Sequence, residues 1–394
     1  MKTDLEKNKN EDQHRSLLRE LNRKLNTVYE GGGERSMAKH KAKGKMAARE
    51  RIEYLLDDKY DWLEVGALAA DGMYEEQGGA PSAGVVTGIG RVSGRLCMIV
   101  ANDATVKAGA WFPMTGKKNL RAQEIAIENK IPIIYLVDSA GVFLPMQDEI
   151  FPDKEHFGRI FRNNAVMSAM GIPQIAAIMG PCVAGGAYLP IMSDEALIVD
   201  GTGYVFLAGP ALVKSAIGET ADIEDLGGAN MHNRVSGVCD YNMPDDSSCL
   251  EKVKSLVGKY GHKPKAGFDR IKAVKPSADM EEILLRFPIN RAVPYDSREL
   301  LECLIDADSF DEDAATLMGF WKQKWGPEKG ETSAKKVAAN FEKVLESAQK
   351  TDALFLPILW RGDTPLAALG HVMDPKVGAM HFIIAGRDTA AEEA

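Results

Sequence analysis

The stretch IPQIAAIMGPCVAGGAYLP, residues 172–190, joins an apolar run to a turn that contains two adjacent glycines. The apolar run is typical of a strand that is covered on both faces. Glycine inside a regular element costs about 0.5–1 kcal/mol relative to alanine, so Gly185 and Gly186 need a specific local reason. The stretch therefore predicts a strand that turns into a helix at a point where the glycines serve either packing or binding.

The segments on either side repeat this alternation of apolar strands and helices. Residues 84–103 read as two strands joined by a turn at 92–95. Further strands are predicted at 131–138, at 195–200 and from 203 onward, and helical segments at 117–130 and 161–171. Apolar strands separated by helices predict an α/β fold whose sheet is covered on both faces.

Length, charge and cysteine usage exclude several classes of protein. The 394 residues are enough for two domains, or for one large domain with extensions. A net charge of −9 argues against a nucleic-acid-binding protein. No apolar run reaches the roughly 18–20 residues of a membrane span, and the N-terminus lacks an apolar signal-peptide core, so we expect a cytoplasmic protein. The five cysteines contain no CxxC pair, which disfavours a disulfide framework or a zinc ribbon.

Several common site types are not supported by the motifs of this chain. No GxxxxGK[ST] loop is present and no GxGxxG opens a helix after a strand, which argues against a P-loop and a Rossmann site. Ser139 lacks the GxSxG turn of hydrolases. His232, Cys239 and Cys249 are not spaced as zinc ligands, so we expect no metal site.

Cys182 lies just before the glycine turn and raises the question of a thiol nucleophile. The start of a helix lowers the pKa of a nearby thiol. The sequence offers no evident histidine partner, although one brought close by the fold stays open. We favour a small buried cysteine that packs beside a tight turn.

The glycine pair itself fits an oxyanion site. At a strand-to-helix junction, the backbone amides that start the helix point outward and carry partial positive charge. Glycine lets a ligand carbonyl approach these amides closely, and such a pair stabilises an oxyanion such as a thioester enolate. Tight packing of the helix against the strand explains Gly185 and Gly186 equally well, so both interpretations stay open at this point.

A cluster of basic residues stands out between residues 37 and 51 of this acidic chain. One interpretation is a solvated helix face, and the other is a site for a polyanionic small ligand. The cluster consists of Lys39, Lys41, Lys43, Lys45, Arg49 and Arg51.

Long parts of the chain resemble a known family. Residues 102–190, from NDATVKAGAWFPMTGKKNLRAQEIA to the glycine turn, closely resemble the carboxyltransferase (beta) subunits of biotin-dependent acyl-CoA carboxylases. Residues 206–240, FLAGPALVKSAIGETADIEDLGGANMHNRVSGVCD, resemble the same family. Residues 144–168, LPMQDEIFPDKEHFGRIFRNNAVMS, are most similar to methylcrotonoyl-CoA carboxylases, and propionyl-CoA carboxylases usually differ there. The resemblance covers about residues 17–260, with many motifs in the same order.

This resemblance implies a crotonase-like fold built of ββα units, and the transfer of carboxylate from carboxybiotin to an acyl-CoA, here methylcrotonoyl-CoA. It implies that the amides of Gly185 and Gly186 hold the thioester oxygen and that biotin takes the substrate proton. DSAG stands at 138–141 where relatives usually have DSGG. The resemblance also implies a set of substrate-binding residues: Ala140, Gly141, Val142, Ala184, Ala187, Lys43, Lys45 and Arg49. That the three basic residues contact the CoA phosphates is our own inference.

The resemblance also implies partners. No AMKM-like biotinyl-lysine sequence and no ATP-grasp glycine-rich loop is visible, so biotin and ATP chemistry would lie on a partner alpha subunit with biotin carboxylase and biotin carrier functions. Family members form oligomers whose active sites lie between the N-terminal domain of one subunit and the C-terminal domain of another. We expect a homo-oligomer and no nucleic-acid or membrane partner.

The expected domain plan follows the extent of the resemblance. Residues 1–30 form a charged helix, 31–262 the N-terminal crotonase-like domain, 263–312 a linker and the start of the C-terminal domain, and 313–394 a divergent α/β tail. After about Asp313 we expect the resemblance to end, with no second glycine pair. Residues 356–374 are faintly similar to GNAT-like acyltransferases, and a hairpin is predicted to turn at Arg361, Gly362 and Asp363.

Two alternative functions stay open. The incomplete C-terminal region favours an acyl-CoA-binding subunit that is catalytically incomplete. A decarboxylase subunit of the glutaconyl-CoA type would share both the fold and the biotin chemistry.

Overall fold

The computed structural model describes residues 4–151, 154–261, 273–290, 292–293, 295–307, 338–345, 354–356, 358–361, 364–374 and 379–387. The chain divides into two units, one formed by Asn22–Lys263 and the other by Met1–Leu21 together with Pro264–Ala394. Each unit has its own sheet.

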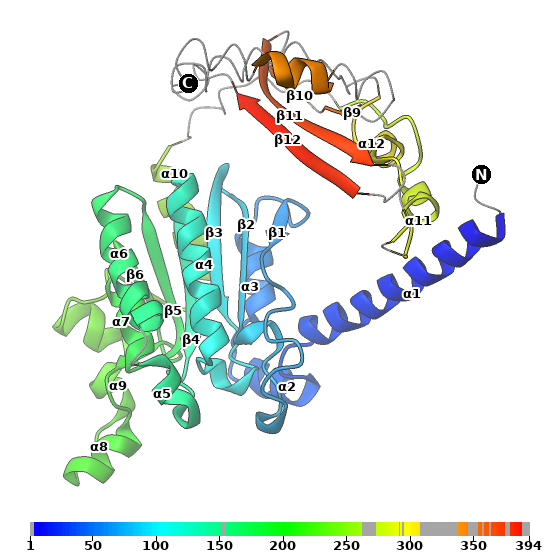
Figure 1. The fold of residues 1–394 in the computed structure, drawn as a ribbon. Coiled ribbons are helices and arrows are strands. Elements are labelled where there is room, and N and C mark those ends of the chain that lie inside the picture. Colours follow the sequence, from blue (N-terminus) through cyan, green and yellow to red (C-terminus); the bar gives the residue numbers. More distant parts are fainter. Residues whose placement is uncertain are drawn as a thin grey trace. The chain divides into compact units, whose positions relative to one another are not determined.

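The larger unit is built on an eight-stranded sheet (Figure 1). The strand order is β1-β2-β3-β4-β5-β6-β8, with β7 paired to β5. The pairs β1–β2 and β2–β3 are antiparallel, and all the others are parallel. In chain order the strands are Trp62–Glu64, Val85–Val92, Arg95–Asn102, Ile133–Ser139, Gln174–Val183, Glu195–Val199, Tyr204–Phe206 and Tyr241–Met243.

The hairpin of β2 and β3 turns where the sequence predicts it. Val92 pairs with Arg95 across Ser93 and Gly94, and these two turn residues have φ values of 49° and 76°. Positive φ at both central residues is typical of tight hairpins, because it matches the twist of the strands. The Asp57 carboxylate accepts hydrogen bonds from both turn amides, which holds this conformation.

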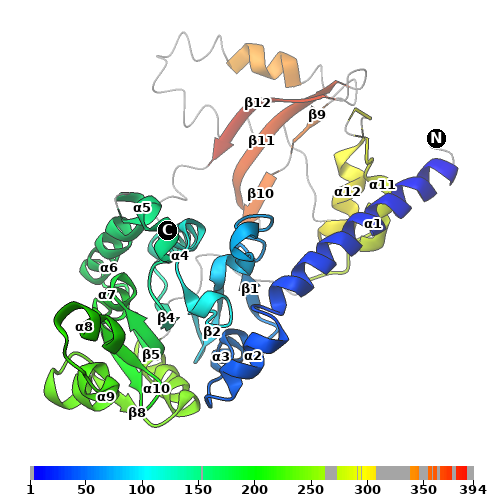
Figure 2. The ribbon, with the colours of Figure 1, turned by 90° about the horizontal axis from the view of Figure 1, so that it is seen from below.

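Helices cover both faces of the sheet (Figures 1 and 2). They are α3 (Ala48–Leu55) and α10 (Asp246–Lys259) on one face, and α4 (Pro113–Asn129) and α6 (Arg159–Ala169) on the other. Alternate residues of each strand enter two buried clusters: Met98 packs with the side chains of α4 and α6, and Ile99 packs with those of α3 and α10. This burial on both faces is the physical reason for the unbroken apolar runs, and it confirms the predicted α/β fold.

The remaining helices of this unit connect or extend the strands. The long helix α1 ends within it, and α2 follows directly. α7 begins at Gly185, immediately after β5, as the sequence predicts. Their bounds are Asp4–Tyr29 for α1, Glu34–Lys41 for α2, Gln147–Ile150 for α5, Gly185–Ile191 for α7, Pro210–Ile217 for α8 and Ile223–Gly227 for α9.

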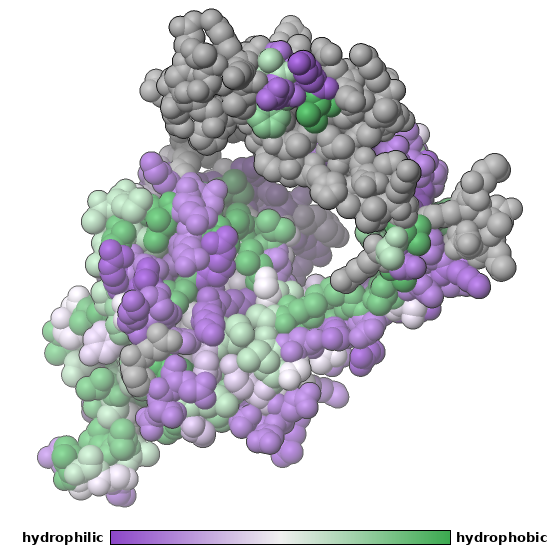
Figure 3. All heavy atoms as spheres, in the orientation of Figure 1, coloured by the Kyte–Doolittle hydropathy of each residue, from purple (hydrophilic) through white to green (hydrophobic). Residues whose placement is uncertain are grey.

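Apolar side chains are exposed around α8. Leu207, Leu212 and Ile217 are 71%, 59% and 65% exposed. The space-filling view shows this green, apolar extension at the lower left (Figure 3). Exposed apolar surface of this kind marks sites of contact with other protein surfaces.

The smaller unit contains a four-stranded antiparallel sheet of order β10-β11-β12, with β9 paired to β11. Arg361 pairs with Thr364, which confirms the predicted hairpin, although Gly362 and Asp363 lie outside the described residues. Two short helices of this unit, α11 and α12, are joined by Arg286, which forms ion pairs with Glu282 and Glu302. The elements are α11 (Ile283–Arg286), α12 (Ser297–Leu304), β9 (Leu354–Phe355), β10 (Ile358–Arg361), β11 (Thr364–Asp374) and β12 (Ala379–Arg387).

None of the helices in the described ranges combines the length and the apolar character that crossing a membrane would require.

Candidate functional site

A cavity of about 670 Å³ opens near the carboxyl ends of β4 and β5. Its walls come from the end of α1, from α2, from residues 78–81 and 104–108, and from Asp138, Ala140 and Pro181. Ligands of parallel α/β sheets bind outside the carboxyl ends of the strands, and the volume fits a small-molecule site. The cavity is therefore the candidate binding site.

Positive charge dominates the polar lining of this cavity. Lys39 on α2, Lys43 just after it and Lys107 after β3 are exposed at the cavity, and none forms an ion pair with another described residue. The carboxylate among the lining residues is Asp138, which is already paired with cations. Cationic charge without a protein counter-ion favours an anionic ligand.

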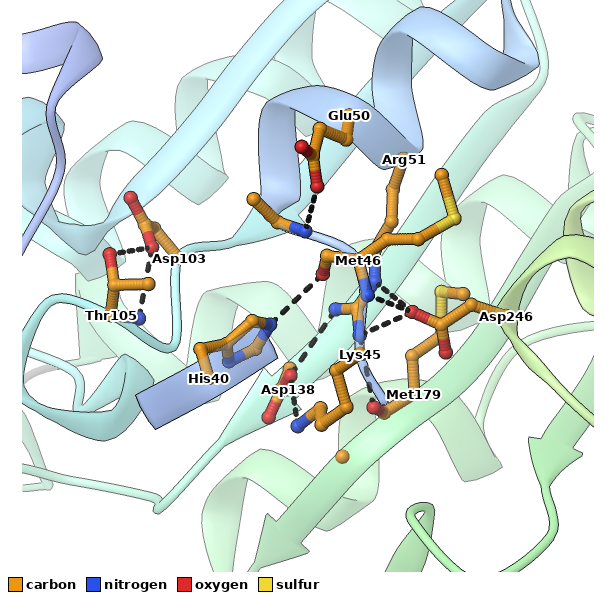
Figure 4. A network of polar contacts seen from close by, with 12 residues as sticks. His40, Lys45, Met46, Glu50, Arg51, Asp103, Thr105, Asp138, Met179 and Asp246 are labelled. Atoms are coloured by element: carbon orange, nitrogen blue, oxygen red, sulfur yellow. Dashed lines mark hydrogen bonds and ion pairs between the residues drawn. The ribbon is translucent and has the colours of Figure 1, made fainter. Parts of the chain in front are cut away.

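Lys45 also lines the cavity, but it belongs to a buried network of charges (Figure 4). Its Nζ lies 2.5 Å from Asp138 Oδ2, and Arg51 Nη1 lies 3.2 Å from the same oxygen. Arg51 also donates to Asp246 Oδ2 at 2.9 Å and to the Met179 carbonyl at 3.2 Å. Two cations thus face two carboxylates, as buried charges require.

This network fixes the chain segment that carries the cavity lysines. The Met46 N–H donates to Asp246 Oδ2 at 2.9 Å, and His40 Nε2 hydrogen-bonds to the Met46 carbonyl (Figure 4). A Cβ on Gly180 would lie 1.8 Å from Asp138 Oδ1, so the network also explains this glycine. Burial lowers the pKa of Lys45, and the neighbouring Asp138 carboxylate opposes this shift.

Gly185 and Gly186 start α7 after an unusual backbone turn. Ala184 has φ 50° and ψ −120°, a conformation that residues with a side chain rarely adopt. Its N–H donates to the Phe206 carbonyl in β7. The amides of Gly185 and Gly186 have no such acceptor within the part of the chain that the structure describes. Two adjacent amides of this kind can hold an oxyanion.

The loop after β4 packs against this turn. A Cβ on Gly141 would lie 2.9 Å from the Val183 carbonyl oxygen, and one on Gly186 would lie 3.7 Å from Gly141 Cα. Gly141 has φ 89°, whereas Ala140 is not among the residues with positive φ, and its N–H donates to the Ala108 carbonyl. Alanine at position 140 therefore requires no special backbone conformation.

The structure brings most of the predicted site residues together. Lys43, Lys45 and Ala140 line the cavity. Gly141, Val142, Ala184, Gly185, Gly186 and Ala187 form the adjoining loop and turn. Arg49 lies apart from these lining residues, because it forms two hydrogen bonds of 2.7 and 2.9 Å with Glu64. The ligand contacts of all these residues stay predictions.

Some residues of the basic cluster form ion pairs within the protein, and others face the cavity as a site for an anionic ligand would require. Lys41 pairs with Glu50, Arg49 with Glu64 and Arg51 with two buried aspartates. Lys39 and Lys43 are directed to the cavity instead.

Sequence reasoning misses Lys107. It starts a run of three residues with positive φ, of 49°, 56° and 68° through Gly109. A Cβ on Gly109 would lie 2.1 Å from the Asp138 carbonyl oxygen, so the run packs tightly against the end of β4. The sequence feature that could have identified Lys107 is its position just beyond the carboxyl end of a predicted strand.

Cys182 and His232 have structural surroundings. Cys182 is fully buried, and burial raises the pKa of its thiol well above the usual value. His232 Nε2 lies 2.6 Å from the Val205 carbonyl oxygen and Nδ1 lies 3.0 Å from Ser236 Oγ. Over the described ranges, no group of histidine, cysteine, aspartate or glutamate side chains could hold a metal ion.

Comparison with known proteins identifies the family of this chain. A family model described as the carboxyl transferase domain matches residues 39–317. The chain belongs to the carboxyl transferase domain family. The crystal structure of the geranyl-CoA carboxylase beta subunit of P. aeruginosa has a TM-score of 0.65 and 31% identity, covering 81% of this chain and 60% of that one. Transcarboxylase 12S with methylmalonyl-coenzyme A and methylmalonic acid bound has a TM-score of 0.58 and 28% identity, over 76% and 58% of the two chains. These neighbours confirm the crotonase-like fold of a carboxyltransferase.

Curated relatives extend the comparison. The biotin-dependent 3-methylcrotonyl-coenzyme A carboxylase beta1 subunit of Mycobacterium tuberculosis is 52% identical over 301 residues, which are 76% of this chain and 56% of the relative. The probable biotin-dependent acyl-coenzyme A carboxylase beta2 subunit of the same organism is 40% identical over 366 residues, 92% of this chain and 66% of the relative. This carboxyl transferase chain spans about half to two thirds of the length of such relatives.

The family model and the beta2 relative differ in how far they extend into the C-terminal residues 313–394. The family model ends at residue 317, close to the point where we expected the resemblance to end. The alignment with the beta2 subunit covers 92% of the chain, so it must continue past Asp313 into the tail.

Proposed function

We propose that this chain is the carboxyltransferase component of a biotin-dependent acyl-CoA carboxylase, with methylcrotonoyl-CoA as its acyl substrate. The proposal depends on a cationic cavity that is lined in part by Ala140. The next residue, Gly141, packs against the turn that carries the Gly185 and Gly186 amides, and the chain is a member of the carboxyl transferase domain family.

The cavity suits the CoA part of the substrate. Lys39, Lys43 and Lys107 offer three cations without described counter-ions, and the phosphates of CoA are polyanionic. Lys45 is neutralised by Asp138, so we assign it a supporting role instead of a phosphate contact. Arg49 is held by Glu64 and is the weakest of the three basic residues inferred to contact CoA phosphates.

The glycine turn suits the acyl end. Removing a proton from the acyl chain places negative charge on the thioester oxygen. The N–H groups of Gly185 and Gly186 would donate to that oxygen, and the loss of one such donor typically costs on the order of 10²–10³ in rate. Ala140, Gly141 and Val142 would form the neighbouring wall, and Ala184 and Ala187 would flank the amides. Biotin, carried by a partner chain, would supply the carboxyl group and accept the proton.

The acyl substrate follows from similarity. The segment at 144–168 resembles methylcrotonoyl-CoA carboxylases. The beta1 subunit of Mycobacterium tuberculosis, which carries that activity in its name, is 52% identical.

The domain limits at residues 30, 262 and 312 and a cytoplasmic location are part of the same proposal.

Partners complete the proposal. A biotin-bearing alpha subunit must deliver carboxybiotin. The exposed apolar side chains Leu207, Leu212 and Ile217 support assembly with further subunits, including copies of this chain.

Reconstitution tests the function. The purified chain is mixed with the biotin-bearing alpha subunit, ATP, labelled bicarbonate and methylcrotonoyl-CoA, and acid-stable label is measured; propionyl-CoA and acetyl-CoA serve as competing substrates. Label that depends on methylcrotonoyl-CoA supports the proposal. Tight acyl-CoA binding without turnover would favour the incomplete subunit. Release of carbon dioxide from glutaconyl-CoA without ATP would favour the decarboxylase type.

A further inference from the structure

One wall of the cavity leads directly into a turn with a strained backbone. Gly78, Gly79 and Pro81 line the cavity. Directly after them, Ser82, Ala83 and Gly84 have φ values of 53°, 55° and 66°. Left-handed conformations are unfavourable for residues with a side chain, and consecutive ones are rare. This wall therefore needs support from outside its own sequence.

The carbonyl groups of this turn are all held by neighbouring donors. Lys118 Nζ lies 3.1 Å from the Ser82 carbonyl oxygen and 2.6 Å from that of Val85. Thr115 Oγ1 donates to the Ala83 carbonyl at 2.6 Å, and the Asp103 N–H donates to the Gly84 carbonyl at 3.0 Å. Lys118 thus ties Ser82, the first residue of the left-handed run, to Val85, the residue that follows the run, and its Nζ also lies 2.7 Å from Ser82 Oγ.

Lys118 is an unusual lysine. It lies in α4 with only 6% of its surface exposed, and its hydrogen-bond partners are two carbonyls and a hydroxyl, with no carboxylate among them. The nearby Glu64 carboxylate is occupied by Arg49. Burial lowers the pKa of Lys118 to about 7. Its neighbour Lys117 is exposed.

We propose that Lys118 is a positioning residue of the acyl-CoA site, whose Nζ holds the left-handed turn at Ser82–Gly84 and thereby sets the Gly78–Pro81 wall of the cavity. The inference rests on the proposed function, because it takes acyl-CoA as the ligand of this cavity. The ammonium has three N–H groups for the two carbonyls and the Ser82 hydroxyl oxygen, and a neutral amine keeps two, enough for both carbonyls.

A cavity lysine also lies against this wall. A Cβ on Gly78 would lie 2.9 Å from Lys107 Nζ, so the Lys107 side chain extends to the wall that Lys118 supports. A shift of the wall would therefore move both the cavity surface and one of its free cations. Loss of Lys118 should weaken ligand binding without removing any group that touches the ligand.

The test compares Lys118→Met with Lys117→Met in the full chain. Affinity for methylcrotonoyl-CoA is measured by calorimetry, and kcat and KM are measured in the reconstituted enzyme. Methionine keeps most of the apolar stem but donates no hydrogen bond, so we expect affinity to fall on the order of tenfold, with KM rising more than kcat falls. Lys117→Met should bind as the wild type does. Equal affinity of the two variants would overturn the inference.

Chemical rescue separates positioning from general stability. Lys118→Ala removes three carbons and the amine, which n-propylammonium can replace. We expect n-propylammonium to restore affinity and tetramethylammonium, which has charge but no N–H, to leave it unchanged. Restoration by neither ion, in a variant that folds, contradicts the inference.

A milder variant covers the case in which the Lys118 variants do not fold. Ser82→Ala removes one of the three oxygens at Nζ and should weaken acyl-CoA binding about two- to threefold. Unchanged affinity of Ser82→Ala would then count against the inference. If the wild-type chain itself fails to bind acyl-CoA, the proposed function fails, which is a distinct result.

Discussion

Lys45 and Asp138 form an ion pair at the cavity wall, with 2.5 Å between Nζ and Oδ2, and their side chains are only 6% and 2% exposed. Asp138 shares the same oxygen with Arg51, which continues to Asp246 on α10. The end of β4, just before the predicted substrate-binding residues Ala140–Val142, is therefore fixed by charges contributed from α3, α10 and the segment between α2 and α3.

The first prediction concerns the stability of this network. Asp138→Asn leaves Lys45 and Arg51 buried without their shared carboxylate, so the free energy of unfolding should fall by about 3–5 kcal/mol. Lys45→Met should cost less, because Arg51 still compensates Asp138. Urea denaturation at neutral pH measures the free energy of unfolding of both variants.

The control for the network is an exposed pair. Lys59 and Glu53 are each 54% exposed, and Lys59→Met should change the free energy of unfolding by less than about 1 kcal/mol. If Asp138→Asn were as mild as Lys59→Met, the network would not carry the stability that we assign to it.

The second prediction tests the oxyanion amides. Gly186→Pro removes one of the two N–H groups at the start of α7 that have no described backbone acceptor, and kcat should fall on the order of 10²–10³. Gly186→Ala keeps the N–H, and its Cβ would meet atoms no closer than 3.6 Å, so the variant should retain most of the activity. Equal losses in both variants, with intact circular dichroism spectra, would indicate a packing role for this glycine.

The third prediction concerns the cavity lysines. Lys43→Gln and Lys107→Gln should each weaken acyl-CoA binding a few-fold, on the order of 0.5–1 kcal/mol at low salt. The difference from the wild type should shrink as salt is added, because exposed charges are screened. Lys41→Gln is the matched control, since Lys41 pairs with Glu50 and does not line the cavity.

The fourth prediction concerns the thiols. Burial raises the pKa of the Cys182 thiol, so the folded protein should react with iodoacetamide at pH 8 far more slowly than the urea-unfolded chain. The other four cysteines are also buried. Cys182→Ala should keep kcat within about a few-fold, since a methyl-sized loss in a packed site mainly affects stability. Rapid native labelling at Cys182 would reopen a nucleophilic role.

Local chemistry explains which features the sequence could predict. The β2–β3 turn could be predicted from Ser93-Gly94, since glycine readily adopts the positive φ that the turn needs. The start of α7 could be predicted from the glycine pair Gly185-Gly186 that follows an apolar strand. The left-handed Ser82 and Ala83 could not be predicted, because their carbonyls are held by the distant donors Lys118 and Thr115 and propensity does not favour their conformation.

Long-range partners explain what was missed in the site. Arg51 reads as one more basic residue of a helix, yet its carboxylate partners lie 87 and 195 positions away in the sequence. Lys117 and Lys118 are chemically identical neighbours, and only the fold makes one exposed and the other buried. Composition and spacing carry no information on such partners.

The fifth prediction is a pH dependence of stability. The pKa of Lys118 is about 7 in the folded chain, against about 10.4 for an unfolded lysine. Between these values the unfolded chain binds more protons than the folded one, so this group makes stability rise with pH, by up to about 1.4 kcal/mol per pH unit. Below pH 7 both states are protonated, and the cost of burying the charge is fully present.

The contribution of Lys118 is obtained by subtracting the free energy of unfolding of a variant without this amine from that of the wild type. The free energy of unfolding of the wild type minus that of Lys118→Met should increase from pH 7 to pH 10. Lys117→Met is the matched control for the loss of an amine from the same helix, because Lys117 is exposed. The slope has to be positive, since a lysine whose pKa falls on folding disfavours the folded state most when it is charged. A flat difference for Lys118→Met would mean that the folded chain keeps this amine protonated, and so that burial does not lower its pKa.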